Sequence, residues 1–143
     1  MDNPQSELCD HIIDEVCVKY LDDKRIFLII SKHNGREHTD SFMNTILDYF
    51  NQHENEKSLY MCFNISQSNY SVYGVRRFMD LHQVLGSKMR GRIAVVVKRN
   101  SIGQTMKLFA QFNLTKPVHE RQFFFDESQA IEWLRDGSRQ IDD

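Results

Sequence analysis

The pattern that decides the fold lies between Arg92 and Leu134, which read RIAVVVKRNSIGQTMKLFAQFNLTKPVHERQFFFDESQAIEWL. This stretch begins with an apolar run, 93–97, that is typical of a strand. An amphipathic segment follows, in which Ser101 is a good N-cap and the apolar residues keep helical spacing. A second apolar run, 123–125, leads into DESQAIEWL, where Asp126 and Gln129 resemble a capping box. The order is strand, helix, strand, helix.

The same alternation extends toward the N-terminus. Asp22-Asp23-Lys24 predict a turn between a half-exposed strand, 16–20, and a continuous apolar strand, 26–30, that is buried on both faces. A helix follows, for which Thr39, Asp40 and Ser41 offer N-caps. The remaining predicted elements are a strand at 59–63, a helix over 75–85 that ends at Gly86, and Gly91 ahead of the fourth strand.

These elements predict one α/β domain of the order β-β-α-β-α-β-α-β-α. Right-handed crossovers make most of its five-stranded sheet parallel. The sheet is mixed because one strand of the hairpin lies antiparallel at the edge. The length of 143 residues suits one domain. We expect Gly137 to stop the last helix. The predicted divisions are therefore a flexible N-terminus at 1–11, a domain at 12–136 and a flexible C-terminal tail at 137–143.

Composition places the chain among ordinary globular proteins, with 41% hydrophobic and 27% charged residues. Its polar and acidic start lacks the regions of a signal peptide, and no apolar run approaches the roughly 18 residues that span a bilayer. We therefore expect a cytoplasmic location and no membrane association.

Metal, redox and catalytic motifs are absent from the sequence. The cysteines Cys9, Cys17 and Cys62 are odd in number and show no short paired spacing, which predicts neither a disulfide framework nor a zinc site. The histidines lack metal-ligand spacing, and His82 fits a hydrogen-bonded core position on its helix. No Gly-x-Ser-x-Gly, Gly-x-Gly-x-x-Gly or P-loop motif is present. We expect no enzymatic activity, no metal and no cofactor.

Charge is distributed unevenly along the chain. The net charge is −2, yet residues 76–107 carry 8 basic and 1 acidic side chains. A nucleic-acid site would need these cations on one surface. Arg90 and Arg92 precede the fourth strand and Lys98 and Arg99 follow it, which separates the two pairs by roughly 20 Å. The pattern favours two modest basic patches, one of which could meet an acidic protein surface, over nucleic-acid binding.

The element order and the ending FFDESQAIEWL resemble the SpoIIAA-like branch of the STAS superfamily, a bacterial group. The resemblance covers residues 12–136, and its moderately specific part is the aromatic strand followed by Asp-Glu-x-x-Ala-Ile-x-Trp-Leu. It implies a non-enzymatic signalling module that binds partner proteins. Some relatives bind nucleotides or apolar ligands.

Well-known members of that family carry an Asp-Ser-Ser-Gly-like motif whose serine, at the start of a helix, is phosphorylated by a partner kinase. This chain reads Ser71-Val72-Tyr73-Gly74, so that Tyr73 stands where the resemblance would place the serine. The other serines of this loop are Ser66 and Ser68. The departure puts a phosphoserine switch in doubt.

Two functional hypotheses follow. The first is a regulatory module that binds a protein partner, of the regulator or kinase type, through the loop and helix after the third strand; a homodimer is left open. The alternative is a small anionic or apolar ligand held at the carboxyl ends of the strands, where loops and helix N-termini converge. The partner-binding candidates are Ser68, Ser71, Tyr73, Arg76 and Arg77. The ligand-binding candidates are His33, Asn64, Lys98, Arg99 and Ser101.

Overall fold

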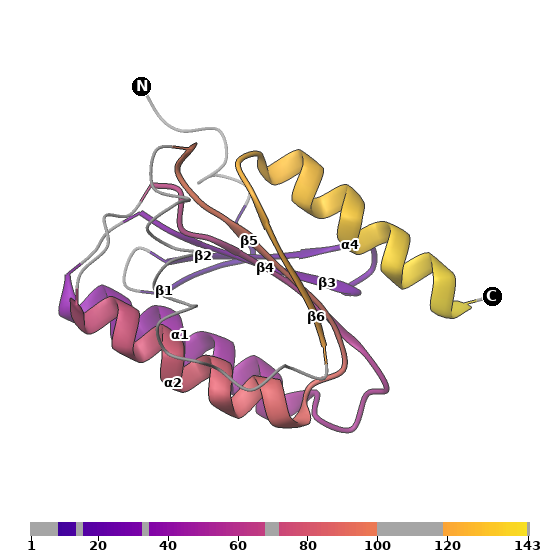
Figure 1. Ribbon diagram of the computed structural model, residues 1–143, viewed down its shortest axis with the longest axis horizontal. Coiled ribbons are helices and arrows are strands. Elements are labelled where there is room, and N and C mark those ends of the chain that lie inside the picture. The colour runs from indigo at the N-terminus through magenta and orange to yellow at the C-terminus, as the bar shows by residue number, and fades with distance from the viewer. Residues whose placement is uncertain (1–8, 14–15, 33–34, 68–71, 100–118, 143) are drawn as a thin grey trace.

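A computed structural model describes residues 9–13, 16–32, 35–67, 72–99 and 119–142 (Figure 1). Its strands are β1 (His11–Ile13), β2 (Val16–Leu21), β3 (Ile26–Ser31), β4 (Leu59–Asn64), β5 (Gly91–Val96) and β6 (Glu120–Phe124). Its helices are α1 (Arg36–Gln52), α2 (Val72–Lys88) and α4 (Glu127–Asp142). None of the helices in these ranges has the length and apolar character that crossing a bilayer requires.

The strands form one six-stranded sheet in the order β1-β2-β3-β4-β5-β6. β1, β2 and β3 pair antiparallel, whereas β3, β4, β5 and β6 pair parallel. The predicted fold class, a single α/β domain with a mixed sheet and an antiparallel N-terminal edge, is confirmed. The predicted number of strands is wrong, because β1 adds a sixth strand outside the hairpin. Three residues are too few for their alternation to stand out in a sequence.

Both faces of the sheet are covered. Figure 1 shows α1 and α2 along one face and α4 across the other. All six residues of β3 are buried, and successive side chains point to opposite faces. Phe27 and Ile29 join the core under α1 and α2, whereas Ile26, Leu28 and Ile30 join the core under α4. The continuous apolar run therefore arises from two separate cores.

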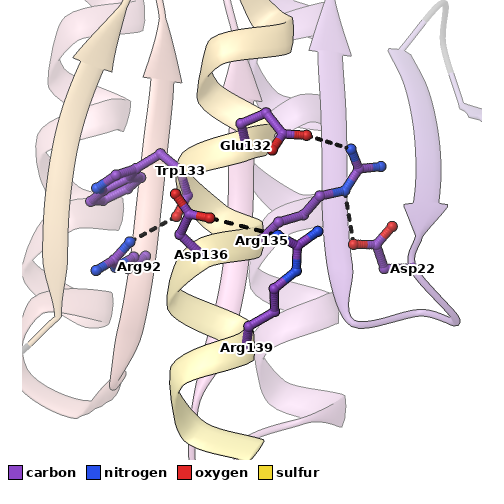
Figure 2. Close-up of polar contacts among 7 residues, drawn as sticks. All are labelled: Asp22, Arg92, Glu132, Trp133, Arg135, Asp136 and Arg139. Atoms are coloured by element: carbon purple, nitrogen blue, oxygen red, sulfur yellow. Dashed lines mark hydrogen bonds and ion pairs between the residues drawn. The ribbon is translucent and has the colours of Figure 1, made fainter.

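An arginine beneath α4 positions that helix on β5 (Figure 2). Arg92 donates a hydrogen bond of 2.7 Å from Nη1 to the carbonyl of Trp133, and its guanidinium carbon lies 4.6 Å from the centroid of the indole ring. Its Nε lies 3.6 Å from Oε2 of Glu120. Gly137 leaves room for this side chain, since a Cβ there would lie 2.6 Å from Cδ of Arg92.

The opposite side of α4 reaches the turn between β2 and β3. Nε of Arg135 donates a 2.9 Å hydrogen bond to Oδ2 of Asp22 (Figure 2). Asp22, Asp23 and Lys24 all have positive φ angles, of 51°, 56° and 69°, which are uncommon for residues other than glycine. The predicted turn is confirmed, and the ion pair with Arg135 ties it to the C-terminal helix.

The helices differ from their predicted ends. α1 begins at Arg36 with Gly35 as N-cap, so the prediction of an N-cap at Thr39, Asp40 or Ser41 is wrong by about one turn. α2 continues through Gly86 to Lys88, and α4 continues through Gly137 to Asp142, so neither glycine stops its helix. Packing decides this at Gly137, where a small residue lets the helix lie close to β5. Together with β1, which begins at His11, α4 extends the described structure beyond both expected domain limits.

Two of the cysteines form a disulfide, contrary to the prediction. Cys9 and Cys17 are bonded, with their Cα atoms 5.5 Å apart, and Cys62 is free and fully buried. Cysteine spacing does not reveal this bond, because the pair joins residues brought together by β1 and β2 rather than a sequence motif. Burial strongly raises the pKa of the Cys62 thiol, and buried cysteines of this kind are inert.

The disulfide predicts a labelling pattern. Protein purified without reductant, unfolded in guanidinium and treated with iodoacetamide should take up one label, at Cys62, whereas prior reduction should give three. A Cys9→Ser variant should take up two labels without reduction, because Cys17 is then a thiol. Three labels on the unreduced wild type, read by intact mass, would show that the bond is absent.

The contact between Gly137 and Arg92 predicts that Gly137→Ala changes the free energy of unfolding in opposite directions with and without the Arg92 side chain. Gly137→Ala should lower the free energy of unfolding by about 1 kcal/mol, because loss of the Arg92 hydrogen bond and ring contact outweighs the gain in helix propensity. In an Arg92→Ala background the same substitution should raise it by roughly 0.5–1 kcal/mol. Urea unfolding of the four proteins measures this cycle. Equal effects of Gly137→Ala in both backgrounds would contradict the contact.

Candidate functional site

The carboxyl ends of the parallel strands meet at one edge of the sheet, which we call the carboxyl edge. Because β3 to β6 run parallel, the residues that follow them, Lys32, Ile65, Val97 and Phe125, lie along this edge. α1 and α2 follow β3 and β4, so their N-terminal turns begin there as well. The edge therefore brings together the described candidates of both functional hypotheses.

A shared carboxylate joins the N-terminal parts of α1 and α2. The hydroxyl of Tyr73 donates to Oδ1 of Asp40, and Nε of Arg77 lies 3.2 Å from the same oxygen. Arg77 also donates from Nη2 to Oδ1 of Asn44, at 3.4 Å. The guanidinium carbon of Arg36 lies 4.3 Å from the centroid of the Tyr73 ring. We call these five residues the α1–α2 cluster.

Helical spacing builds the α1–α2 cluster. Arg36, Asp40 and Asn44 are four residues apart on α1, and Tyr73 and Arg77 are four apart on α2, so each set lies on one side of its helix. The hydrogen bond to Asp40 raises the pKa of the Tyr73 hydroxyl, which therefore stays protonated and donates at neutral pH. The contacts hold the beginning of α2 against α1.

Two of the five residues of this cluster were predicted from the sequence as partner-binding residues. They are Tyr73 and Arg77, and the predicted Arg76 lies exposed on the same helix. Arg36, Asp40 and Asn44 were not predicted, because Asp40 was expected as an N-cap, one turn later than α1 begins. The signal was present in the polar residues at 36, 40 and 44, which share a helix side away from the apolar stripe. Ser68 and Ser71 lie outside the residues that the structure describes.

Asn64 serves the fold. Its Nδ2 donates a 2.9 Å hydrogen bond to Oε1 of Glu127, which links the end of β4 to the start of α4. Its Oδ1 accepts from the backbone N–H of Ser66 at 3.0 Å and from the Ser66 hydroxyl at 2.6 Å. The Asn64 side chain predicted to contact a ligand is thus buried and engaged by its own chain.

The basic residues after β5 extend the carboxyl edge. The guanidinium carbon of Arg99 lies 4.6 Å from the centroid of the Phe125 ring, which is 38% exposed. Lys98 is partly exposed next to it. Arg92, in contrast, points under α4 from the other end of β5, as the predicted separation of the basic pairs requires. His33 and Ser101, the other ligand candidates, lie outside the described residues.

Two buried histidines lie beside an arginine between α2 and β6. Nη1 of Arg121 lies 2.6 Å from Nδ1 of His82, and the rings of His82 and His119 are 6.1 Å apart between centroids. The core position predicted for His82 is confirmed, since its exposure is 6%. Burial, together with the charges of His82 and Arg121, lowers the pKa of His119 to about 4. His119 is therefore neutral at pH 7.

Metal-binding geometry is missing from the described ranges, where no three His, Cys, Asp or Glu side chains gather closely enough to hold an ion. The one acid in the α1–α2 cluster is engaged by Tyr73 and Arg77. The α1–α2 cluster is therefore a polar surface, held in place by its own contacts, with aromatic and guanidinium groups.

Comparisons with known proteins agree with this architecture. No protein-family model matches the sequence, and no curated protein matches it. A solved structure does match, that of an uncharacterized DUF3478 family protein with a SpoIIAA-like fold from Shewanella loihica PV-4. The TM-score is 0.54, and the match covers 83% of this chain and 93% of that one. This chain has a SpoIIAA-like fold.

The SpoIIAA-like fold agrees with the fold part of the resemblance in the sequence. At 15% identity the likeness concerns architecture alone. Function must therefore be argued from the side chains of this chain.

The buried position of His119 predicts acid sensitivity. As the pH falls from about 6.5 to about 4, the unfolded chain binds a proton at His119 and the folded chain does not. The free energy of unfolding should therefore fall across this window, by roughly 1–3 kcal/mol. Above pH 6.5 the side chain is neutral in both states and contributes no pH dependence. Urea unfolding at pH values between about 7.5 and about 4.5 measures this fall in stability. His119→Gln should flatten the pH profile. An unchanged slope in this variant would contradict the assignment.

Proposed function

We propose that this chain is a non-catalytic regulatory module that binds a protein partner through the N-terminal turns of α1 and α2. The observation that carries the proposal is the α1–α2 cluster, in which Asp40 joins Tyr73 to Arg77 while Arg36 packs on the tyrosine ring. Tyrosine and arginine dominate the energetics of protein interfaces. A surface whose side chains are already held in place loses less entropy on binding.

Charge indicates the kind of partner. Arg36 and Arg76 are exposed, and the Asp40 carboxylate is shared with Arg77. The charged side chains at the ends of β3 and β5 and in the first two turns of α1 and α2 are Lys32, Arg36, Arg76, Arg77, Lys98 and Arg99, against Glu37 and Asp40. This excess of positive charge favours an acidic protein surface and would speed its association at low salt.

Two further acids at this edge, Asp126 and Glu127, reduce the excess to six cations against four acids. Asp126 accepts hydrogen bonds from the backbone N–H and hydroxyl of Ser128, at 2.9 and 2.8 Å, and these bonds lower its pKa. Glu127 accepts from Asn64. Both carboxylates therefore accept hydrogen bonds at the start of α4. This helix covers the opposite face of the sheet from α1 and α2.

Charge reversal tests the docking surface. Tagged full-length chain should recover a partner from its native lysate, and the recovered partner, once purified, should bind Arg76→Glu or Arg36→Glu at least about tenfold more weakly. Tyr73→Phe keeps the ring and removes the bond to Asp40, so it should weaken binding by less. Lys57→Glu is the matched control, because Lys57 lies after α1, toward the other edge of the sheet, and is exposed.

The outcomes separate this function from ligand binding. Circular dichroism and melting temperature should show that the variants remain folded. Wild-type affinity in both charge-reversal variants would contradict the proposed surface. A small molecule seen by native mass spectrometry and lost on denaturation, together with no partner, would favour the ligand hypothesis instead.

A further inference from the structure

The disulfide between Cys9 and Cys17 joins two parts of the chain that differ in burial. Cys17 is 4% exposed and belongs to the core beneath α4, in a strand that pairs along its whole length with β3. Cys9 is only partly buried, and all three residues of β1 are exposed. The bond therefore attaches a strand without buried side chains to a strand that is part of the core.

Few non-covalent contacts hold β1. It pairs with β2 over three residues, and no strand in the described ranges pairs with its other side. The backbone N–H of Asp10 donates to the carbonyl of Val18 at 2.8 Å, and Oδ2 of Asp10 accepts from the N–H of Tyr20 at 2.7 Å. His11 packs edge-on against Tyr20, with 5.9 Å between ring centroids. An edge strand of this length that buries no side chain is marginal without further support.

The disulfide supplies that support. It joins residues that are eight apart in the sequence, and it thus removes much of the freedom that a detached β1 would gain. The entropy of closing a loop of this length favours the attached strand by roughly 50- to 100-fold. Reduction removes this factor and leaves the non-covalent contacts alone to hold β1.

The pair is suited to open and close reversibly. Cys9 is the partly exposed half of the bond, so a reductant meets its sulfur first. Cys62, the third cysteine, lies on β4, with β3 between it and β2. Two strand spacings place it roughly 10 Å from Cys17, whereas the Cα atoms of a disulfide lie within about 7 Å of each other. Reoxidation therefore restores the bond between Cys9 and Cys17.

We propose that the bond between Cys9 and Cys17 is a redox switch, which attaches β1 to the sheet when oxidised and releases it when reduced by a dithiol. In the reduced state β2 becomes the outermost strand. The backbone groups of β2 that β1 covers in the oxidised state are then free to pair with another strand. None of these residues belongs to the α1–α2 cluster, so this proposal and the proposed function can fail separately.

Thiol–disulfide exchange accounts for every atom and electron of the switch. One thiolate of the dithiol attacks the Cys9 sulfur and forms a mixed disulfide, while the Cys17 sulfur leaves and takes up a proton. The second thiol of the reductant then attacks the reductant's sulfur in the mixed disulfide, and Cys9 leaves as a thiol. Two electrons and two protons thus pass to Cys9 and Cys17 from the dithiol, which becomes a cyclic disulfide.

Hydrogen exchange of the full-length chain, followed by NMR, tests the switch with dithiothreitol as the reductant. Intact mass after alkylation in guanidinium should first show that dithiothreitol opens the bond in the folded protein. The amides of Asp10 and Tyr20 should then exchange at least about tenfold faster than in the oxidised protein, because the loop-closure factor is lost. The amides of β4 should remain protected, and oxidised glutathione should restore slow exchange at Asp10 and Tyr20.

Two variants serve as matched controls. Cys9→Ser lacks the bond and should exchange fast at Tyr20 with or without dithiothreitol. Cys62→Ala removes the other cysteine, keeps the bond and should respond to dithiothreitol as the wild type does.

Three results would overturn the proposal. The first is equal exchange at Asp10 and Tyr20 in the oxidised and reduced proteins. The second is a bond that dithiothreitol does not open in the folded chain. The third is loss of protection throughout β4 on reduction, which would make the bond a support of the whole fold rather than of β1.

Discussion

The three central strands of the sheet are apolar on both faces, and this constraint determines the layout of the rest. β3, β4 and β5 cannot leave either face in water without losing the burial that stabilises the domain. Helices α1 and α2 lie on one face because β3, β4 and β5 are neighbours in sequence order and right-handed crossovers that advance in one direction place their helices on the same side. The other face is left for α4.

α4 covers this second face and is held there by a small number of specific contacts. Leu134 and Ala130 are fully buried against the sheet, and the Gly137 backbone lies over Arg92. Tyr60 donates from its hydroxyl to the carbonyl of Gly137 at 3.2 Å, which adds a link to β4. Arg135 then joins the helix to the β2–β3 turn. The C-terminal helix is thereby tied to four strands or their turns rather than to β6 alone.

The α1–α2 cluster and the outer strand β1 lie in different parts of this frame. The α1–α2 cluster is basic and belongs to helices at the carboxyl edge, whereas β1 is an edge strand with exposed apolar side chains. Fold alone does not assign a function to the α1–α2 cluster, since one fold supports many functions.

Local pattern was sufficient to predict the alternation of strands and helices, the turn at Asp22, and the core position of His82, because each depends on residues close in the chain. The helix ends and the disulfide depend on contacts between distant residues. In the sequence Gly137 indicates a helix stop, and only the packed structure places Arg92 beneath it. Cys9 belongs to a predicted N-terminal tail, and only the pairing of β1 with β2 brings it to Cys17. In the sequence Asp40 likewise indicates a helix cap, and only the structure shows its contacts with Tyr73 and Arg77 of another helix. Hydrophobic periodicity thus determined the architecture, whereas the candidate surfaces were decided by which polar side chains the packed elements brought within reach.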